Sequence, residues 1–287
     1  MAKISDQDGV IWKNGKLEEW RDCKTHALTH GLHYGSGVFE GIRAYEGKVF
    51  KAKEHFERFL KSGELISLDI PYTVEEMIEA TYEVMKKNNL SDCYIRPLAY
   101  INDDSLGIKS SDVGVDVIIS AWAWGSYYGK DGLKLGKTEW RKPDPRTAPV
   151  QAKASGMYVT ASMNNNEAQK KGYNDMLMLD VDDNVAECTV SNIFFIAEDG
   201  VVHTPSAEGF LNGITRQTII QLANREGIEL IERKIKPEEL GSFVAGFTCG
   251  TAAEVAPIAE VWDDYKYDVN NKTLQKLKKL YEEEVRK

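Results

Sequence analysis

The sequence lacks long hydrophobic runs and an excess of positive charge. Its apolar stretches, such as residues 117–121 and 193–197, are much shorter than the roughly 20 residues that span a bilayer, and its N-terminal segment has no apolar core typical of an export signal. Lysine and arginine total 36 against 45 aspartate and glutamate, so the net charge is -9, and no basic stripe offers a surface for nucleic acid. We expect a soluble, cytoplasmic protein that binds neither membranes nor nucleic acids.

Cysteines are scarce and widely spaced, without a CxxC pair: Cys23, Cys93, Cys188 and Cys249. Reduced thiols are therefore expected rather than disulfides or a thiolate metal site. His26, His30 and His33 would share one face of a helix, but no carboxylate or thiol nearby completes a zinc site. We predict no bound metal.

The signatures of several large enzyme classes are missing. The chain has no GxSxG elbow, no HExxH, no GxxxxGK[ST] loop and no GxGxxG after a strand. No repeat or low-complexity tract is present either, which argues against solenoids and propellers. With 287 residues, of which 42% are apolar and 28% charged, the composition is that of a globular protein of enzyme size.

The periodicity predicts an alternating α/β chain. Thr73 and Glu76 form a capping box at the start of a helix that ends near Asn88, and Thr215 is the expected cap of a second helix that ends before a left-handed Gly227. The expected helices are 54–67, 73–88, 215–226 and 274–285, and the expected strands are 48–51, 115–124, 175–181, 192–197, 229–235 and 243–249.

Four glycines and a polar composition interrupt the pattern after Trp124, and a proline-rich stretch follows. A domain boundary is expected there. We predict an N-terminal α/β domain of residues 1–124, an interdomain loop of residues 125–136 and a C-terminal α/β domain of residues 137–287.

One lysine has an unusual setting. Lys153 lies in QAKASGMY, among small residues that let a large planar group approach the backbone. Downstream, Glu187 comes just before an apolar strand that Asn192 opens, and the motif continues through Thr204 to LNGITR at 211–216. This spaced pattern resembles the class IV pyridoxal-phosphate aminotransferases, which are fold type IV enzymes.

Further segments are similar to one branch of that family, the branched-chain amino acid aminotransferases: 30–47 (HGLHYGSGVFEGIRAYEG), 53–59 (KEHFERF), 94–98 (YIRPL) and 249–258 (CGTAAEVAPI). The resemblance runs from about Trp12 to Trp262. It implies two α/β (α+β) domains that hold pyridoxal 5'-phosphate in the interdomain cleft, near the loop of residues 125–136, with Lys153 on the C-terminal domain. It also implies a homodimer or a multiple of dimers.

The resemblance assigns roles that suit the chemistry of each group. Lys153 is the Schiff-base lysine, which also moves a proton between substrate and cofactor. Glu187 faces the pyridine nitrogen, because an electron sink works best when that nitrogen is protonated, and the alternative is an ordinary solvated acid. Backbone amides at the start of the helix near residue 215 suit the phosphate, and they belong to Gly213, Ile214 and Thr215.

By the same resemblance, Arg58 binds the phosphate and Tyr158 the phenolic oxygen, although Arg58 could instead form a surface pair with Glu54. Thr251 belongs to the phosphate and substrate-carboxylate cup, with Ala252 beside it. Arg96 suits a carboxylate better than lysine would. The implied substrate pocket has aromatic walls and a polar pair, which are Tyr34, Phe39 and Trp124 for the walls and Tyr94 with Arg96 for the pair. Phe39 and Trp124 could equally be core aromatics.

The implied activity is ping-pong transamination of L-leucine, L-isoleucine or L-valine with 2-oxoglutarate. Residues 188–192 (CTVSN) resemble the D-amino acid aminotransferase and aminodeoxychorismate lyase branches more closely. A D-amino acid or R-amine transaminase and a lyase therefore stay open as alternatives, as does a binding protein without turnover.

Overall fold

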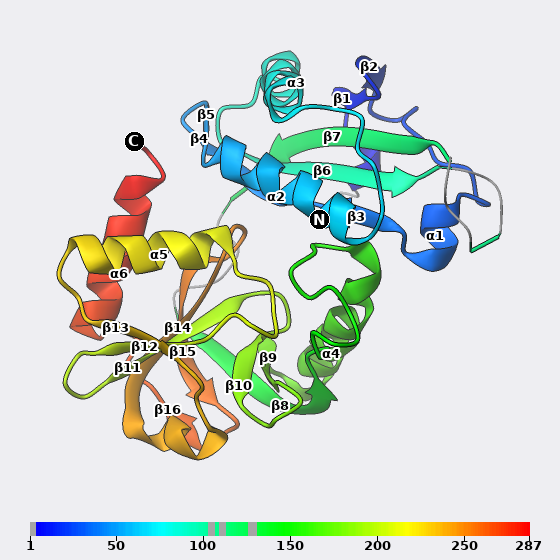
Figure 1. Cartoon of the computed structure of the whole chain (residues 1–287). Helices are drawn as coiled ribbons and strands as arrows, with labels where there is room; N and C mark the ends of the chain where they lie inside the picture. The colour runs from blue at the N-terminus through cyan, green and yellow to red at the C-terminus, as the bar shows by residue number, and fades with distance from the viewer. Residues whose placement is uncertain (1–3, 103–106, 109–112, 126–130) are drawn as a thin grey trace. The chain divides into compact units, whose positions relative to one another are not determined.

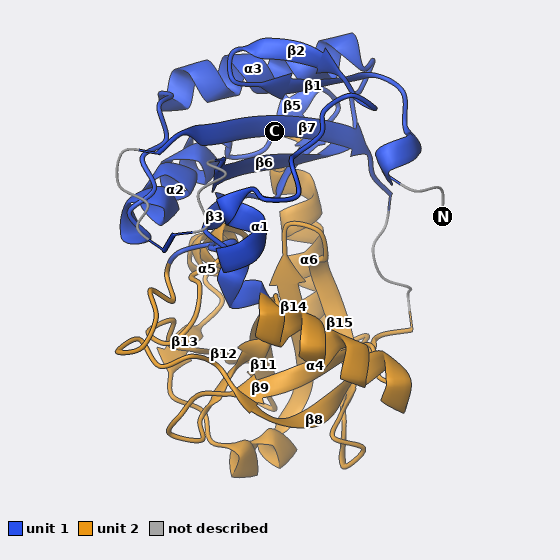
Figure 2. Cartoon of the chain, turned by 90° about the vertical axis from the view of Figure 1, so that its right-hand side faces the viewer, with its two compact units in different colours: residues 1–125, 152–158 blue, residues 126–151, 159–287 orange. Residues whose placement is uncertain are grey.

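The computed structural model describes residues 4–102, 107–108, 113–125 and 131–287. Contacts divide the chain into two compact units, the first of residues 1–125 with 152–158 and the second of residues 126–151 with 159–287 (Figure 2). Both units mix strands and helices, as the sequence predicted. Part of the predicted interdomain loop, residues 126–130, lies outside the described residues.

Within the described residues, the first unit is built on a sheet of seven strands in the order β2-β1-β7-β6-β4-β5, with β3 also paired to β6 (Figure 1). All of its pairings are antiparallel. The strands are β1 (Val10–Lys13), β2 (Lys16–Glu19), β3 (Gly37–Phe39), β4 (Ile42–Tyr45), β5 (Lys48–Val49), β6 (Cys93–Ile101) and β7 (Val115–Ala123).

Helices α2 (Ala52–Leu65) and α3 (Val74–Lys87) pack on this sheet, whereas α1 (His30–Tyr34) is a single short turn of helix. The predicted capping box at Thr73 and Glu76 is confirmed, because the Thr73 hydroxyl accepts from the Glu76 amide and the Glu76 carboxylate accepts from the Thr73 amide. Alternate residues of β6, such as Ile95 and Ala99, join the apolar core. Tyr94 and Arg96 therefore share the opposite face of the sheet.

The second unit has, among its described residues, a sheet of nine strands in the order β10-β9-β8-β15-β14-β11-β12-β13, with β16 on β15. The pairs β8/β9, β8/β15 and β12/β13 are parallel and the others antiparallel. The strands are β8 (Leu133–Arg141), β9 (Asp175–Leu179), β10 (Val185–Cys188), β11 (Asn192–Ala197), β12 (Val202–Pro205), β13 (Leu230–Arg233), β14 (Phe243–Gly250), β15 (Glu254–Val261) and β16 (Tyr265–Lys266).

The helices of the second unit are α4 (Tyr158–Lys171), α5 (Ile214–Arg225) and α6 (Lys272–Glu284), of which α5 and α6 lie side by side (Figure 1). The prediction that Thr215 caps α5 is wrong, because Gly213 holds the N-cap position and no side chain bonds the first amides. Gly227 does adopt the predicted left-handed conformation after the helix. Short 3₁₀ turns occupy Ile4–Asp6, Ser155–Met157 and Pro237–Ser242.

Two features differ from the predicted domain limits. Strand β8 begins at Leu133, inside the segment predicted as a loop, because Leu133 and Leu135 are buried on either side of an exposed Lys134. Residues 152–158, with Lys153, group with the first unit rather than the second. Backbone bonds explain this grouping, since the Phe39 amide donates to the Lys153 carbonyl and Val38 bridges Ala154.

All four cysteines are free. Nowhere in the described part of the chain do three histidine, cysteine or acidic side chains gather as metal ligands would. Of the helices that the structure describes, none has the length and apolar character to cross a membrane.

Candidate active site

Lys153 is held at both its backbone and its amine. Its amide donates to Ser62 Oγ at 3.0 Å, and its Nζ donates to the Tyr158 hydroxyl at 2.7 Å. Nζ also lies 4.8 Å from the centre of the Phe39 ring, which packs edge-on against Tyr158. These contacts bring together three residues that the sequence singled out and place a single amine between two aromatic rings.

Arg58 belongs to a buried charged cluster on α2. Its Nε and Nη2 donate to the two carboxylate oxygens of Glu40, at 2.6 and 2.9 Å, and His55 Nδ1 lies 2.8 Å from Glu40 Oε2. The alternative of a surface pair with Glu54 is wrong, because Arg58 is nearly buried and Glu54 lies beside Lys51 instead. Arg58 Nη1 is buried and bonds no acceptor of the described chain. The guanidinium is thus fixed by Glu40 with one donor to spare.

Electrostatics in this cluster favour a charged Glu40 beside a neutral His55. Burial alone would raise the pKa of Glu40, but the charge of Arg58 and the hydrogen bonds from Arg58 and His55 hold it well below its usual range. Burial lowers the pKa of His55, and the attraction of Glu40 offsets only part of that change. The pair of Glu40 and Arg58 therefore carries no net charge.

An aromatic and cationic patch forms on the face of the first sheet that Tyr94 and Arg96 share. Arg96 Nη2 donates to the Tyr94 hydroxyl at 3.2 Å, and the guanidinium lies 4.9 Å from the centre of the Phe39 ring. Trp124 packs on Tyr94, with ring centres 5.1 Å apart. Gly41 has room for no side chain, because a β-carbon there would overlap the Tyr94 hydroxyl. The predicted walls and polar pair are in contact, with Tyr34 as the exception.

Tyr34 lies on α1 and keeps 46% of its surface exposed. Its ring packs against His30, with centres 4.7 Å apart. In the single chain it is too open to be a pocket wall, so its predicted role stays a prediction.

In the second unit, Glu187 on β10 is buried rather than solvated, so the alternative of a loop acid is wrong. Lys142 Nζ lies 2.7 Å from Glu187 Oε1, and Asn192 Nδ2 donates to Glu187 Oε2 at 2.9 Å. The carboxylate is thus held by a cation on one oxygen and by an amide on the other.

Asn192 also fixes the start of α5. Its Oδ1 accepts from the Gly213 amide at 3.1 Å, and its Nδ2 donates to the Leu211 carbonyl at 3.1 Å. A β-carbon at position 213 would overlap Asn192 Oδ1, so a larger residue there must displace the Asn192 side chain. Helix α5 has no side-chain cap, so the amides of Ile214 and Thr215 have no acceptor within the helix. Uncapped amides at the start of a helix can bind an anion.

The remaining predicted residues, Thr251 and Ala252, are half-buried in the turn between β14 and β15. The loop before α5 is held by Arg216, which donates to the Pro205 carbonyl and to Asn212 Oδ1, both at 2.9 Å. These bonds fix the backbone of the loop before α5.

Sequence reasoning missed three residues of these clusters: Glu40, His55 and Lys142. Glu40 and His55 lie inside motifs that the sequence did single out, but their pairing across β3 and α2 leaves no periodic signal. Lys142 stands at the edge of a proline-rich stretch, where a surface charge is the usual interpretation.

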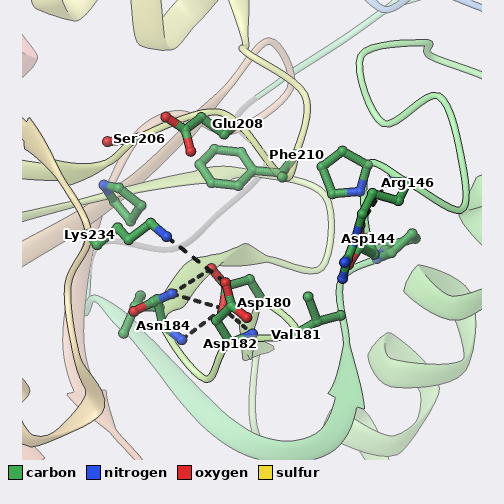
Figure 3. Close-up of a pocket in the computed structure, with 15 residues that line it drawn as sticks. Asp144, Arg146, Asp180, Val181, Asp182, Asn184, Ser206, Glu208, Phe210 and Lys234 are labelled. Atoms are coloured by element: carbon green, nitrogen blue, oxygen red, sulfur yellow. Dashed lines mark hydrogen bonds and ion pairs between the residues drawn. The ribbon is translucent and has the colours of Figure 1, made fainter.

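A separate pocket of about 360 Å³ lies in the second unit, and none of the predicted site residues lines it (Figure 3). Several of its charged side chains pair with one another, as Asp144 does with Arg146 and Lys234 with Asp182. Asp180 caps its own turn by accepting from the Asp182 and Asn184 amides. We assign no ligand to this pocket.

Comparisons with known proteins show similarity over most of the chain. A model of the family described as amino-transferase class IV matches residues 37–261. The branched-chain-amino-acid aminotransferase of Pseudomonas aeruginosa is 40% identical to this chain, and the match covers 97% of this chain and 93% of that protein.

Solved structures show the same fold. The branched-chain aminotransferase from Thermoproteus uzoniensis with norvaline is 37% identical, with a TM-score of 0.92 over 96% of this chain and 94% of that one. The branched-chain amino acid aminotransferase from Thermobaculum terrenum, solved in its PLP-form, is 28% identical, with a TM-score of 0.85 over 98% and 95%. The predicted fold class is confirmed, and the chain belongs to the class IV aminotransferase family.

Proposed function

We propose that this protein transfers the amino group of L-leucine, L-isoleucine or L-valine to 2-oxoglutarate, giving branched-chain 2-oxo acids and L-glutamate. Pyridoxal 5'-phosphate is the proposed cofactor, and the two half-reactions alternate in a ping-pong sequence. The observation that carries the proposal is the Lys153 amine, 2.7 Å from the Tyr158 hydroxyl, in a chain 40% identical to a branched-chain enzyme.

The residues present fit this cofactor. When bound, pyridoxal phosphate supplies a carbonyl that joins to amines and a ring that stabilises negative charge on the α-carbon. The spare buried donor of Arg58 and the uncapped start of α5 both suit phosphate oxygens. Glu187 is oriented on both oxygens and, as a carboxylate, can still accept another hydrogen bond, which suits a protonated ring nitrogen.

Lys153 has two proposed tasks. Its Nζ would hold the cofactor covalently, and as a free amine it would move a proton at the substrate's α-carbon. Tyr158 holds Nζ in place through its hydroxyl, and the Lys153 backbone is pinned to Ser62. A positioned base of this kind accounts for a large share of the rate.

Substrate choice rests on the patch of Phe39, Tyr94, Arg96 and Trp124. The aromatic rings offer an apolar surface for a branched side chain. Arg96 adds a cation with a buried Nε that bonds no acceptor of the described chain, which suits the side-chain carboxylate of glutamate. We propose that one patch serves both substrates, with Arg96 used in only one half-reaction.

A visible absorption spectrum of the purified protein with pyridoxal phosphate tests the function. We expect the band of the bound cofactor to disappear when L-leucine is added alone and to return with 2-oxoglutarate. A band that ignores L-leucine but bleaches with D-alanine would favour the D-amino acid branch, which residues 188–192 resemble. Pyruvate released from 4-amino-4-deoxychorismate without an oxo acid would favour the lyase. A band that responds to none of these would indicate a binding protein.

Two further expectations stay predictions. The homodimer, or multiple of dimers, is tested by the mass in solution from light scattering. The cytoplasmic location is tested by fractionation of the source cells.

A further inference from the structure

Lys142 is a buried lysine whose ammonium contacts Glu187. It follows directly after β8, and its amide donates to the Leu179 carbonyl at 2.9 Å, which continues the pairing of β8 with β9. Its side chain is only 12% exposed, an unusual degree of burial for lysine. Nζ lies 2.7 Å from Glu187 Oε1 and donates to the Thr189 carbonyl at 2.9 Å. The ammonium is therefore fixed in place rather than swinging in solvent.

Glu187 needs such a partner because it is itself only 8% exposed. A carboxylate out of water is costly unless it is paired, and an unpaired one takes up a proton instead. A protonated acid does not hold a second proton on a ring nitrogen, because that task needs a negative acceptor. The charge of Glu187 is thus a condition of its proposed role.

Other described groups near Glu187 are neutral, acidic or paired elsewhere. Asn192 donates to its second oxygen but is neutral. The charge of Glu187 influences the thiols of Cys188 and Cys249, and burial raises the pKa of both thiols, so they stay neutral. Asp175 lies nearby, and burial raises the pKa of its carboxyl as well, partly offset by Thr189 and Lys142. Arg216, on α5, offsets part of the rise in the pKa of the Cys249 thiol by its charge. The Arg216 guanidinium is itself paired with Glu232.

We propose that Lys142 is a positioning residue that keeps Glu187 ionised and oriented, and that it thereby lets Glu187 hold a proton on the ring nitrogen of the cofactor. This inference rests on the proposed function. Lys142 does not touch substrate in this scheme. It acts through Glu187, while the Thr189 carbonyl keeps the ammonium from moving toward the cofactor itself.

The experiment compares two cofactors in three variants. Lys142→Met removes the charge at similar length, Lys142→Arg keeps it, and Lys137→Met makes the same change on β8 at a lysine that lies over Trp262. Each protein is titrated with pyridoxal phosphate and with its analogue in which carbon replaces the ring nitrogen. Dissociation constants come from the absorbance of the bound cofactor.

We expect Lys142→Met to bind pyridoxal phosphate about tenfold more weakly, the size of a lost charged hydrogen bond. Affinity for the carbon analogue should not change, because that analogue has no ring nitrogen. Lys142→Arg should recover most of the affinity, and Lys137→Met should match the wild type. Unchanged affinity in Lys142→Met, or an equal loss for both cofactors, would overturn the inference. If Lys142→Met does not fold, Lys142→Gln takes its place.

The pH dependence gives a second readout. An unpaired Glu187 takes up a proton at higher pH, so the deficit of Lys142→Met relative to the wild type should grow as pH falls from about 9 to about 6. If this affinity deficit stays constant with pH, Lys142 does not act by keeping Glu187 ionised. Failure of the proposed function is seen separately, because a wild-type protein that shows no band with pyridoxal phosphate would overturn both proposals.

Discussion

The two units bury opposite charges and support each with its counter-charge. In the first unit a cation, Arg58, is held by the buried acid Glu40. In the second unit an acid, Glu187, is held by the buried base Lys142. Both pairs join segments that are distant in the sequence, and both partners come from the same unit.

The comparison teaches how a chain prepares a site for a charged cofactor. A buried ion without a partner costs several kcal/mol. Because each unit neutralises its own ion, the groups proposed to hold the cofactor are paired within their own unit. The proposed groups also differ between the units. They are long side chains in the first unit, and backbone amides at the start of α5 with one carboxylate in the second.

The largest expected effect is a loss of turnover when the amine of Lys153, in the first unit, is removed. Lys153→Ala should lower turnover of L-leucine with 2-oxoglutarate by about a thousandfold or more, because both the covalent link and the proton carrier are lost. Steady-state rates measure this, with circular dichroism to show that the fold is kept. Lys137→Ala is the matched control. More than trace activity in Lys153→Ala would remove Lys153 from its proposed role.

Breaking the ion pair of the first unit should mainly affect stability. Glu40→Gln leaves Arg58 buried and without its counter-charge, so the free energy of unfolding should fall by about 3–5 kcal/mol. Urea denaturation measures it. Glu57→Gln on α2, whose partner Lys53 is exposed, should cost less than about 0.5 kcal/mol. Similar losses in the two variants would contradict the importance of the buried pair.

The same pair predicts an acid dependence. The pKa of Glu40 is lower in the folded chain than in the unfolded one, so its contribution is present above the unfolded value of about 4.3 and is lost as pH falls toward the folded value. Stability of the wild type should therefore drop more between about pH 5 and about pH 3 than that of Glu40→Gln. Parallel pH profiles would contradict the lowered pKa.

A substitution at the start of α5 tests whether the second unit contributes to cofactor affinity through its backbone amides. Gly213→Ala puts a β-carbon against Asn192 Oδ1 at a backbone angle that alanine accepts, so the effect comes from the contact alone. Displacing Asn192 weakens its bond to Glu187, and we expect affinity for pyridoxal phosphate to fall about tenfold. Gly209→Ala, which meets no atom within 4 Å, is the control. Equal affinities in the two variants would dismiss the link through Asn192.

The smallest effect is one of selectivity. Arg96→Ala should slow the half-reaction with L-glutamate about tenfold more than that with L-leucine, since only glutamate has a side-chain carboxylate to bind. Tyr94→Phe, which removes one hydrogen bond to Arg96, should shift the ratio in the same direction by less. Single-turnover bleaching of the cofactor band measures both. Equal losses for the two substrates would show that Arg96 does not select between them.

The sequence by itself determined the local features and the family. The capping box at Thr73 and the glycine after α5 each need only a few neighbouring residues, and the structure has both. The motifs around Glu187 and residues 211–216 led to the class IV aminotransferases, which the comparisons show.

Only the tertiary structure decided which buried side chains pair with each other. Glu40 with Arg58, Lys142 with Glu187, and the grouping of Lys153 with the first unit all depend on how separate segments of the chain pack together. Periodicity carries no information on such packing. A charge beside a turn looks the same in the sequence whether it meets water or a buried counter-charge, and burial is what separates the two.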